Sequence, residues 1–327
     1  AITGATGDDL DFLSDKARQF GKENTLSAVE AAKAFKLIAS AKPDLLESGA
    51  ALAQVTEQAI KLAEAAGQDL PAAANALGAS LNQFASGADN AARFVNVLAA
   101  GSKFGAASVA ETSEALKFAG TVANDAGVSF ETTVAAIQQL SKVAIKGGEA
   151  GTGLRNIIIR LAAAGKRELD PAVVGLTQAL KNLNAENLTT VELTELVGLR
   201  SVVALKALVN NTAALEELEA QVTGTNIALE QQAARLDNLD GDIKKMSSAY
   251  SELKIAIELA SDEGLRKFTQ SMTEMFLKLG ENIDQVLKMA KSIGILIASI
   301  ASARLLGPII GAVASGLFTL VKALGAF

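Results

Sequence analysis

Residues 130–145 read FETTVAAIQQLSKVAI, and the apolar spacing in this stretch predicts the fold. The side chains of Phe130, Val134, Ile137, Leu140 and Ala144 follow one another at intervals of four, three, three and four residues. These intervals place all five on one stripe of an α-helix, as expected for a helix that packs against a core. The stretch therefore predicts a helix with one buried face.

Helix start and stop signals recur on both sides of this stretch. A hydroxyl residue followed three positions later by Glu forms a capping box, in which the hydroxyl accepts from an early backbone N–H and the Glu side chain reaches back to the N-cap N–H. Asp69 precedes Pro71, and proline is well tolerated in a first helical turn. Glycines that follow apolar segments suit left-handed helix ends. The boxes are Ser27 with Glu30, Ser108 with Glu111 and Thr189 with Glu192, and the glycines are Gly67, Gly87, Gly127 and Gly165. We therefore expect a compact bundle of helical hairpins over residues 1–187.

Composition supports an all-α class. The chain is 50% hydrophobic but only 4% aromatic, and it has four prolines in 327 residues. Alternating β-branched and aromatic runs, which predict strands, are not found. The chain has no cysteine and no histidine, which excludes thiolate and imidazole catalysis and the usual zinc ligands. A net charge of -6 gives no basic footprint for nucleic acid, so we expect no specific nucleic-acid binding.

A strict seven-residue period replaces the short helices after about residue 188. A sustained period of this kind predicts a coiled coil, so we expect a long helix or coiled-coil segment over residues 188–262. The alternative is a long helix packed back on the first domain. Asn211 and Gln232 fall in the predicted seam and are candidates for setting its register. The predicted seam consists of Leu208, Leu215, Leu218, Val222, Leu229, Leu236, Leu239, Ile243, Met246, Tyr250, Leu253 and Ile257.

We expect residues 263–327 to form a hydrophobic helical segment, and residues 293–321 are its most apolar run. Arg304 divides this run, and its second half, 305–321, has no charged residue. Seventeen apolar residues are about the lower limit for a membrane span. Two interpretations stay open: a membrane-insertion segment, or an apolar helix buried in an oligomer. The candidate membrane-insertion residues are Ile293, Ile295, Leu296, Leu305, Leu306, Ile309, Ile310, Val313, Leu317 and Phe318.

The glycine-rich residues 145–156, IKGGEAGTGLRN, are the most distinctive local motif. A phosphate loop needs Gly-Lys followed by Ser or Thr, and a dinucleotide fingerprint needs a preceding strand; both are missing. The acidic set Asp237, Asp240 and Asp242 lacks the spacing of a calcium loop. We therefore interpret the glycines as a sharp turn between helices and predict no cofactor, no metal and no catalytic residues. The chain begins at Ala1 and ends in apolar sequence at Phe327, so we expect a piece of a longer protein.

Several segments, taken in order, resemble the core region of bacteriophage tail tape measure proteins. The glycine-rich loop with its following helix is the most specific of them, and its residues are Gly147, Gly148, Ala150, Gly151, Thr152, Gly153, Leu154, Arg155 and Asn156. One departure is Asn96, where the resemblance leads us to expect an acidic residue. The other matching segments are 62–70 (LAEAAGQDL), 92–99 (ARFVNVLA), 115–120 (ALKFAG), 126–129 (AGVS), 160–161 (RL), 187–189 (NLT) and 192–193 (EL).

The resemblance implies a structural role in the virion. Such a protein fills the lumen of the tail tube, its helical length sets the tube length, and its apolar segments assist genome ejection through the host membrane. The implied partners are further copies of the chain, with a trimer favoured, tail tube and tail tip proteins, tail assembly chaperones and the host membrane. The alternative function is a membrane-active, pore-forming protein that uses residues 293–321 as a hydrophobic hairpin. An enzyme on a helical scaffold is remote, because no acid–base pair stands out.

Overall fold

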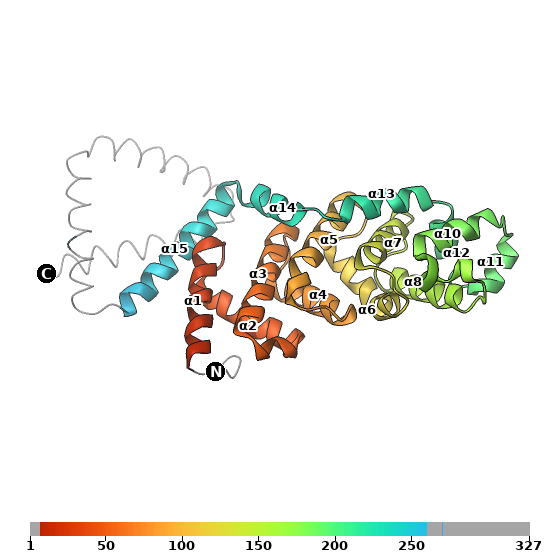
Figure 1. Cartoon of the computed structure of the whole chain (residues 1–327). Helices are drawn as coiled ribbons and strands as arrows, with labels where there is room; N and C mark the ends of the chain where they lie inside the picture. The colour runs from red at the N-terminus through yellow and green to blue at the C-terminus, as the bar shows by residue number, and fades with distance from the viewer. Residues whose placement is uncertain (1–6, 260–269, 271–327) are drawn as a thin grey trace. The chain divides into compact units, whose positions relative to one another are not determined.

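The structure, a computed structural model, describes residues 7–259 and residue 270. All regular structure in these residues is helical, which confirms the predicted all-α class. Figure 1 follows the helices in chain order. Their bounds are α1 Asp8–Glu23, α2 Ala28–Ala41, η1 Pro43–Glu47, α3 Gly49–Ala66, α4 Leu70–Gln83, η2 Ala88–Asn90, α5 Ala91–Phe104, α6 Val109–Asp125, α7 Phe130–Lys142, α8 Gly147–Ala162, η3 Arg167–Leu169, α9 Pro171–Val174, α10 Leu176–Ala185, α11 Thr190–Val197, α12 Val202–Val209, α13 Thr212–Val222, α14 Ile227–Leu236 and α15 Leu239–Leu259.

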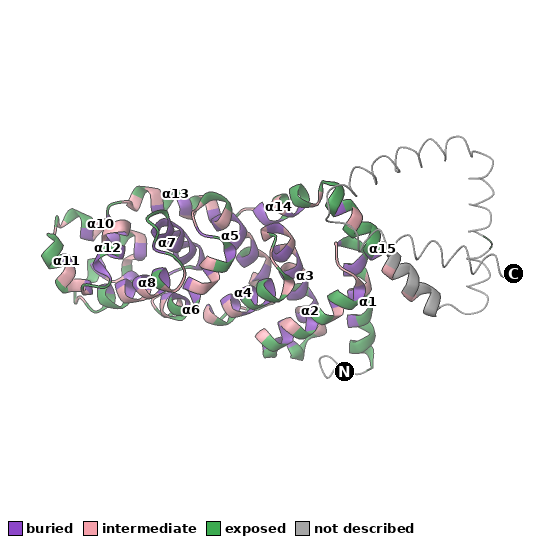
Figure 2. Ribbon diagram, turned by 180° about the vertical axis from the view of Figure 1, so that it is seen from behind, coloured by how far each residue is buried: buried purple, intermediate pink, exposed green. Residues whose placement is uncertain are grey.

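Residues 1–255 form one compact unit, and α7 lies inside it. Helices α5, α6, α8, α12 and α13 all pack against α7. Every residue of α7 from Phe130 to Ser141 is buried, and Figure 2 shows this helix in the buried colour. Four residues of the predicted stripe, Phe130, Val134, Ile137 and Leu140, are each 0% exposed. The buried face is wider than the stripe predicts, because neighbours cover the polar side of the helix as well.

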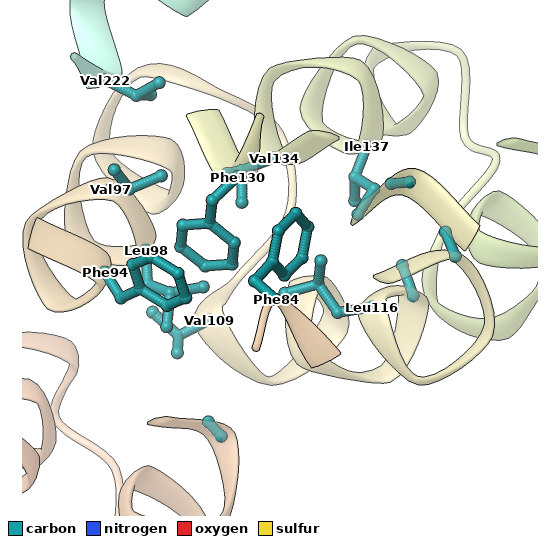
Figure 3. Packing of buried hydrophobic residues seen from close by; sticks show 14 of the residues in the cluster. Phe84, Phe94, Val97, Leu98, Val109, Leu116, Phe130, Val134, Ile137 and Val222 are labelled. Atoms are coloured by element: carbon teal, nitrogen blue, oxygen red, sulfur yellow. The ribbon is translucent and has the colours of Figure 1, made fainter. Parts of the chain in front are cut away.

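Three phenylalanines join α7 to α5 and to the end of α4 in the core (Figure 3). The rings of Phe94 and Phe130 stack with their centroids 4.0 Å apart and 10° between their planes. The Phe84 ring meets both edge-on, at 6.0 Å from Phe94 and 5.1 Å from Phe130. Such pairs contribute about 1 kcal/mol each beyond their buried area. The cluster fixes the end of α4 and the start of α5 against the start of α7.

A buried side-chain amide on α7 forms hydrogen bonds with the backbone groups of the turn between α5 and α6. Gln138 is 0% exposed. Its Oε1 accepts from the backbone N–H groups of Ala106 at 2.9 Å and Ala107 at 2.8 Å. Its Nε2 donates to the Ala107 carbonyl at 3.1 Å and to Thr112 Oγ1 at 2.9 Å. Because all four hydrogen-bonding positions of the amide are used, this polar group is buried without a desolvation penalty.

The predicted helix starts are confirmed. Each of the three capping boxes is formed, at Ser27, Ser108 and Thr189. The Asp69 carboxylate accepts from the Ala72 N–H at 2.7 Å, with Pro71 in the first turn of α4. Local sequence therefore fixes where these helices begin, since the orphan N–H groups find their partners within three residues.

Two predictions are wrong: Gly87 as a left-handed helix end and Ala144 as a core residue. In both places an alanine takes the left-handed conformation that follows the helix. Gly87 has φ −92, and the left-handed residue after α4 is Ala85, with φ 46. Ala144 lies beyond the end of α7, exposed and with φ 65, so it is not part of the core stripe. In its place Ile145 turns into the core and its N–H bonds the Leu140 carbonyl at 3.2 Å. This helix-ending bond places Ala144 in a conformation that glycine usually takes. The predicted left-handed Gly67, Gly127 and Gly165 are confirmed.

The chain passes residue 187 without leaving the compact unit, which differs from the predicted domain boundary between 187 and 188. Helices α13 and α14 return along the unit and pack on α3, α5 and α7. The physical reason is that α13 carries an apolar face, and α5 and α7 offer an apolar surface that has no other cover.

The capping boxes generate a prediction about acid stability. The pKa of Glu111 lies below its ordinary value of 4.5, first because the Ser108 backbone N–H donates to the carboxylate and next because the Ser108 hydroxyl does. The pKa of Glu192 is lowered in the same way by Thr189. A folded pKa below the unfolded one contributes stability that is present above the unfolded pKa and is lost as pH falls through the folded pKa.

We therefore expect Glu111→Gln to lower the free energy of unfolding by about 0.5 kcal/mol near neutral pH, a value typical of solvent-screened charges at helix starts. The difference from the unchanged chain should vanish at about pH 3, where carboxylates become protonated. Urea unfolding at both pH values measures it. Glu114→Gln, beyond the first turn of the same helix, is the matched control and should remove less of the acid dependence. Equal pH dependence for the two variants would contradict the prediction.

Close packing of α8 on α6 generates a second prediction. A Cβ placed on Gly151 would clash with the Ala115 carbonyl oxygen of α6, which belongs to a helix backbone and cannot move aside. We expect Gly151→Ala to destabilise the chain by about 1–3 kcal/mol, as overpacking does.

Gly148→Ala is the matched control in the same helix, because its Cβ would meet only the ring edge of the exposed Phe118, at 3.0 Å. That ring can rotate away, and alanine favours the helix over glycine by about 1 kcal/mol. Thermal unfolding of the two variants should therefore move in opposite directions. A Gly151→Ala variant as stable as Gly148→Ala would show that α6 and α8 are not held this close.

Candidate functional site

The seven-residue repeat lies on four helices, α12 to α15, rather than on one. Breaks occur at residues 210–211, 223–226 and 237–238. The predicted continuous helix over 188–262 is therefore not the conformation of this structure. Thr223 is extended and Gly224 has φ 65, and neither conformation can continue an α-helix. Whether these positions form a seam between chains stays a prediction.

Helix α13 carries three positions of the repeat and buries them inside the chain. Leu215 and Val222 are 0% exposed and Leu218 is 1% exposed. They face α5 and α7, and Figure 3 shows Val222 near Val97 of α5 at the edge of the core cluster. Leu208, on α12, is also 0% exposed. In this conformation the first four residues of the predicted seam are therefore an internal packing face.

Polar contacts hold the other side of α13. Glu219 accepts from Thr132 Oγ1 of α7 at 2.7 Å and from Thr177 Oγ1 of α10 at 3.1 Å. The Glu216 carboxylate pairs with Lys181 of α10. These contacts line a surface groove between α10 and α13. Glu219 therefore joins three helices through its two carboxylate oxygens.

Helix α14 continues along the unit and packs on α3 and α5. Ile227 and Ala228 are buried, whereas Leu229 of the repeat is 59% exposed. Gln232, predicted as a seam residue that sets register, instead donates to Glu64 Oε2 at 2.5 Å and to Asn24 Oδ1 at 3.3 Å. The other oxygen of Glu64 binds Thr25. We call α13 and α14 together, residues 212–236, the strap.

The later positions of the repeat are more exposed. Leu239 is 45% and Met246 is 52% exposed, while Leu236 and Ile243 are half-buried. Ser248 is buried, and its hydroxyl lies within hydrogen-bond distance of the Gly21 carbonyl in the last turn of α1 and of the Leu26 carbonyl beyond it. The side chains of Tyr250, Leu253 and Ile257 lie outside the described residues, although α15 runs past all three. Among the positions whose burial the structure describes, the repeat is therefore buried over α12 and α13 and exposed or half-buried from Leu229 to Met246.

The glycine-rich motif is helical, which corrects its interpretation as a loop. Helix α8 begins at Gly147, whose φ is 52, so the turn lies at residues 143–147. Gly148 faces Phe118, Gly151 faces Ala115 and Gly153 faces Ala204. Asn156 Nδ2 donates to Ser201 Oγ at 3.1 Å. Ala150 and Leu154 are buried, and Thr152 and Arg155 are half-buried. The motif lets α8 approach α6 and α12 closely, because small residues leave no side chains between the backbones.

Chemical sites are sparse among residues 7–259. No group of three or more acidic residues that could hold a metal ion occurs there. Lys146, at the start of α8, pairs with Glu111 at 3.2 Å. The pKa of Lys166 is raised above its ordinary value by the hydrogen-bonded carboxylate of Glu186, as in a surface ion pair. These contacts are structural and bring no acid–base pair together.

The candidate membrane-insertion residues, Ile293 to Phe318, lie outside the described residues. In the part that the structure does describe, no helix combines the length and apolarity that crossing a bilayer requires.

Asn96 and Glu64 are site residues that sequence reasoning did not assign. Asn96 Oδ1 accepts from the Ala228 N–H at 3.1 Å and so caps the start of α14 from α5. A carboxylate would accept this bond equally well, which explains why an acidic residue is expected there from the resemblance. Neither residue carries a local signal, because its partner on the strap lies more than a hundred positions later in the chain.

The chain is similar to known phage tail proteins. The family profile described as phage-related minor tail protein matches residues 14–302. The chain is 28% identical over 306 residues to a "Tape measure protein" of Pneumococcus phage Dp-1, an alignment that covers 84% of this chain and 25% of that protein. It is 28% identical over 322 residues to a "Probable tape measure protein" of Escherichia phage P2, with 90% of this chain and 39% of that protein covered. No solved structure matches.

These relatives confirm the resemblance to tape measure proteins, and the chain spans well under half the length of either. Since the family profile covers most of the chain, including all the helices from α2 to α15, the chain belongs to the phage-related minor tail protein family.

Proposed function

We propose that this chain is the part of a tape measure protein that lies in the lumen of a phage tail tube and helps to set the tube length. The observation that carries the proposal is the unbroken seven-residue period from Leu208 to Ile257 in a member of a phage tail family. An extended helix has a fixed rise of about 1.5 Å per residue, so its length is proportional to its residue number. A coiled coil of several copies would make such a ruler stiff.

The proposed partners follow from the same role. Further copies of the chain, a trimer by resemblance, would pair along the repeat, while tail tube and tail tip proteins would surround them. Tail assembly chaperones would cover the apolar faces before assembly, because a long helix has no core of its own. At infection the chain would leave the virion tail, and residues 293–321 would meet the host membrane and assist genome ejection.

The proposed role is structural rather than enzymatic. Support comes from the absence of histidine and cysteine in the sequence and from ion pairs that serve packing. The pore-forming alternative rests on residues 293–321 alone, and the relatives that the chain matches carry tape measure names. We therefore keep the tail role as the proposal.

Inserted copies of α15 test the ruler. Its 21 residues are three heptads, so each tandem copy keeps the repeat in phase. We expect each added copy to lengthen the tail by about 30 Å on the helical rise. Because a tube grows in whole rings, one, two and three extra copies should be compared in the phage that encodes the chain. Electron microscopy of released tails gives the slope.

The control replaces α15 by a different sequence of equal length with the same apolar positions, which should leave tail length unchanged. Tails of constant length across the insertion series would place this segment outside the measuring part and contradict the ruler proposal for it.

A further inference from the structure

The strap and the predicted seam use the same side chains. Leu215, Leu218 and Val222 follow the seven-residue repeat, and all three are buried against α5 and α7. A side chain buried in its own chain cannot also face a second chain. The repeat nevertheless continues without a change of phase into Leu229, Leu239 and Met246, which are exposed. One continuous pattern is therefore buried in its own chain as far as Val222, whereas its described positions from Leu229 to Met246 are exposed or half-buried.

A change of backbone conformation marks the break between the two helices of the strap. Residues 223–226 leave the helix at an extended Thr223 and a left-handed Gly224, with φ 65. A Cβ on Gly224 would have no atom within 4 Å, so no neighbouring group requires a glycine at this position. Four residues thus separate two helices whose apolar positions stay in one heptad phase.

Polar contacts fasten the strap in two ways: the buried Gln232 donates to Glu64 and Asn24, and exposed or half-buried groups bond at its edges. Glu219 is half-buried and binds the Thr132 and Thr177 hydroxyls. Lys103 reaches the exposed Glu230 at 3.5 Å. Water can replace these edge contacts at small cost, whereas the buried apolar face needs another apolar partner if it leaves α5 and α7.

We infer that the strap is an exchangeable interaction surface whose partner, once it leaves α5 and α7, is the same face of a second copy of this chain. Residues 223–226 and residues 237–238 then become helical, and α13, α14 and α15 join into one rod. The exposed residues Leu229, Leu239 and Met246 make the first contact, because they need no release. The inference rests on the proposed function only in taking the repeat as a seam between copies.

Gly224→Ala tests the inference directly. Alanine is strained at positive φ and favours helix over glycine, so both effects shift the balance from the strap to the rod, by about tenfold or more. Gly165→Ala is the matched control: its φ is 69 and no atom lies within 4 Å of its Cβ, but it lies outside the repeat. Gly165→Ala should introduce the same strain at positive φ, but no conversion of the strap into the rod would relieve that strain.

The chain has no cysteine, so Val222→Cys in the full 327-residue chain is a clean reporter. Two quantities should be measured in dilute solution and at rising concentration: the rate of labelling by a thiol reagent, and the fraction cross-linked between copies at position 222 on oxidation. We expect Gly224→Ala to raise both about tenfold and Gly165→Ala to leave both within about twofold of the parent. Equal effects of the two glycine variants, or association without any cross-link at 222, would overturn the inference.

A second pair keeps the test decisive if Gly224→Ala folds poorly. Glu219→Ala removes the two hydroxyl contacts and leaves the apolar face intact, so labelling and cross-linking should again rise. Glu217→Ala is its control, because Glu217 is exposed and bonds only Gln221 within the same helix, at 3.2 Å. Equal labelling and cross-linking of these two variants would also contradict the release of the strap from α5 and α7. None of these outcomes depends on tail length, so failure here is distinguishable from failure of the ruler.

Discussion

The burial of α7 on every side is the constraint on which the compact unit depends. A helix in this position needs apolar neighbours for Phe130, Val134 and Ile137, and hydrogen-bond partners for its polar side chains. Gln138 meets the second need by closing the turn between α5 and α6, and Glu131 does so by pairing with Arg93 at 2.9 Å. An unpaired amide or carboxylate at these sites would cost more than a typical surface substitution. The surrounding helices are therefore placed by both the apolar and the polar surface of α7.

Small residues let the neighbours of α7 come close enough to cover it. Gly151 brings α8 to the backbone of α6, and Gly101 brings α5 to Val134 of α7. Because a glycine contact has no side chain to repack, such places fix the distance between helices. The motif that resembles tape measure proteins most strongly is thus a packing device in this structure. It needs no ligand to explain it.

The strap connects this core to the proposed function. Its α13 closes the last face of α7, and it does so with residues whose period suits a coiled coil. The apolar side chains of a heptad face can be buried equally well by an apolar groove in the same chain or by a matching face of another chain. The polar contacts of Glu219 and Gln232 supply that distinction here, since each has a specific partner in the compact unit. Fold and assembly therefore compete for one surface.

The sequence by itself determined the all-α class, the helix starts at Ser27, Ser108 and Thr189, and the apolar stripe of α7. These features depend on residues at most a few positions apart, and hydrogen bonds or helical spacing decide them locally. Only the tertiary structure decided that α7 is buried all round, that the glycine-rich motif is helix, and that the first half of the repeat faces α5 and α7. The physical reason is distance along the chain: Asn96 and Ala228, or Glu64 and Gln232, meet only after the helices between them have packed.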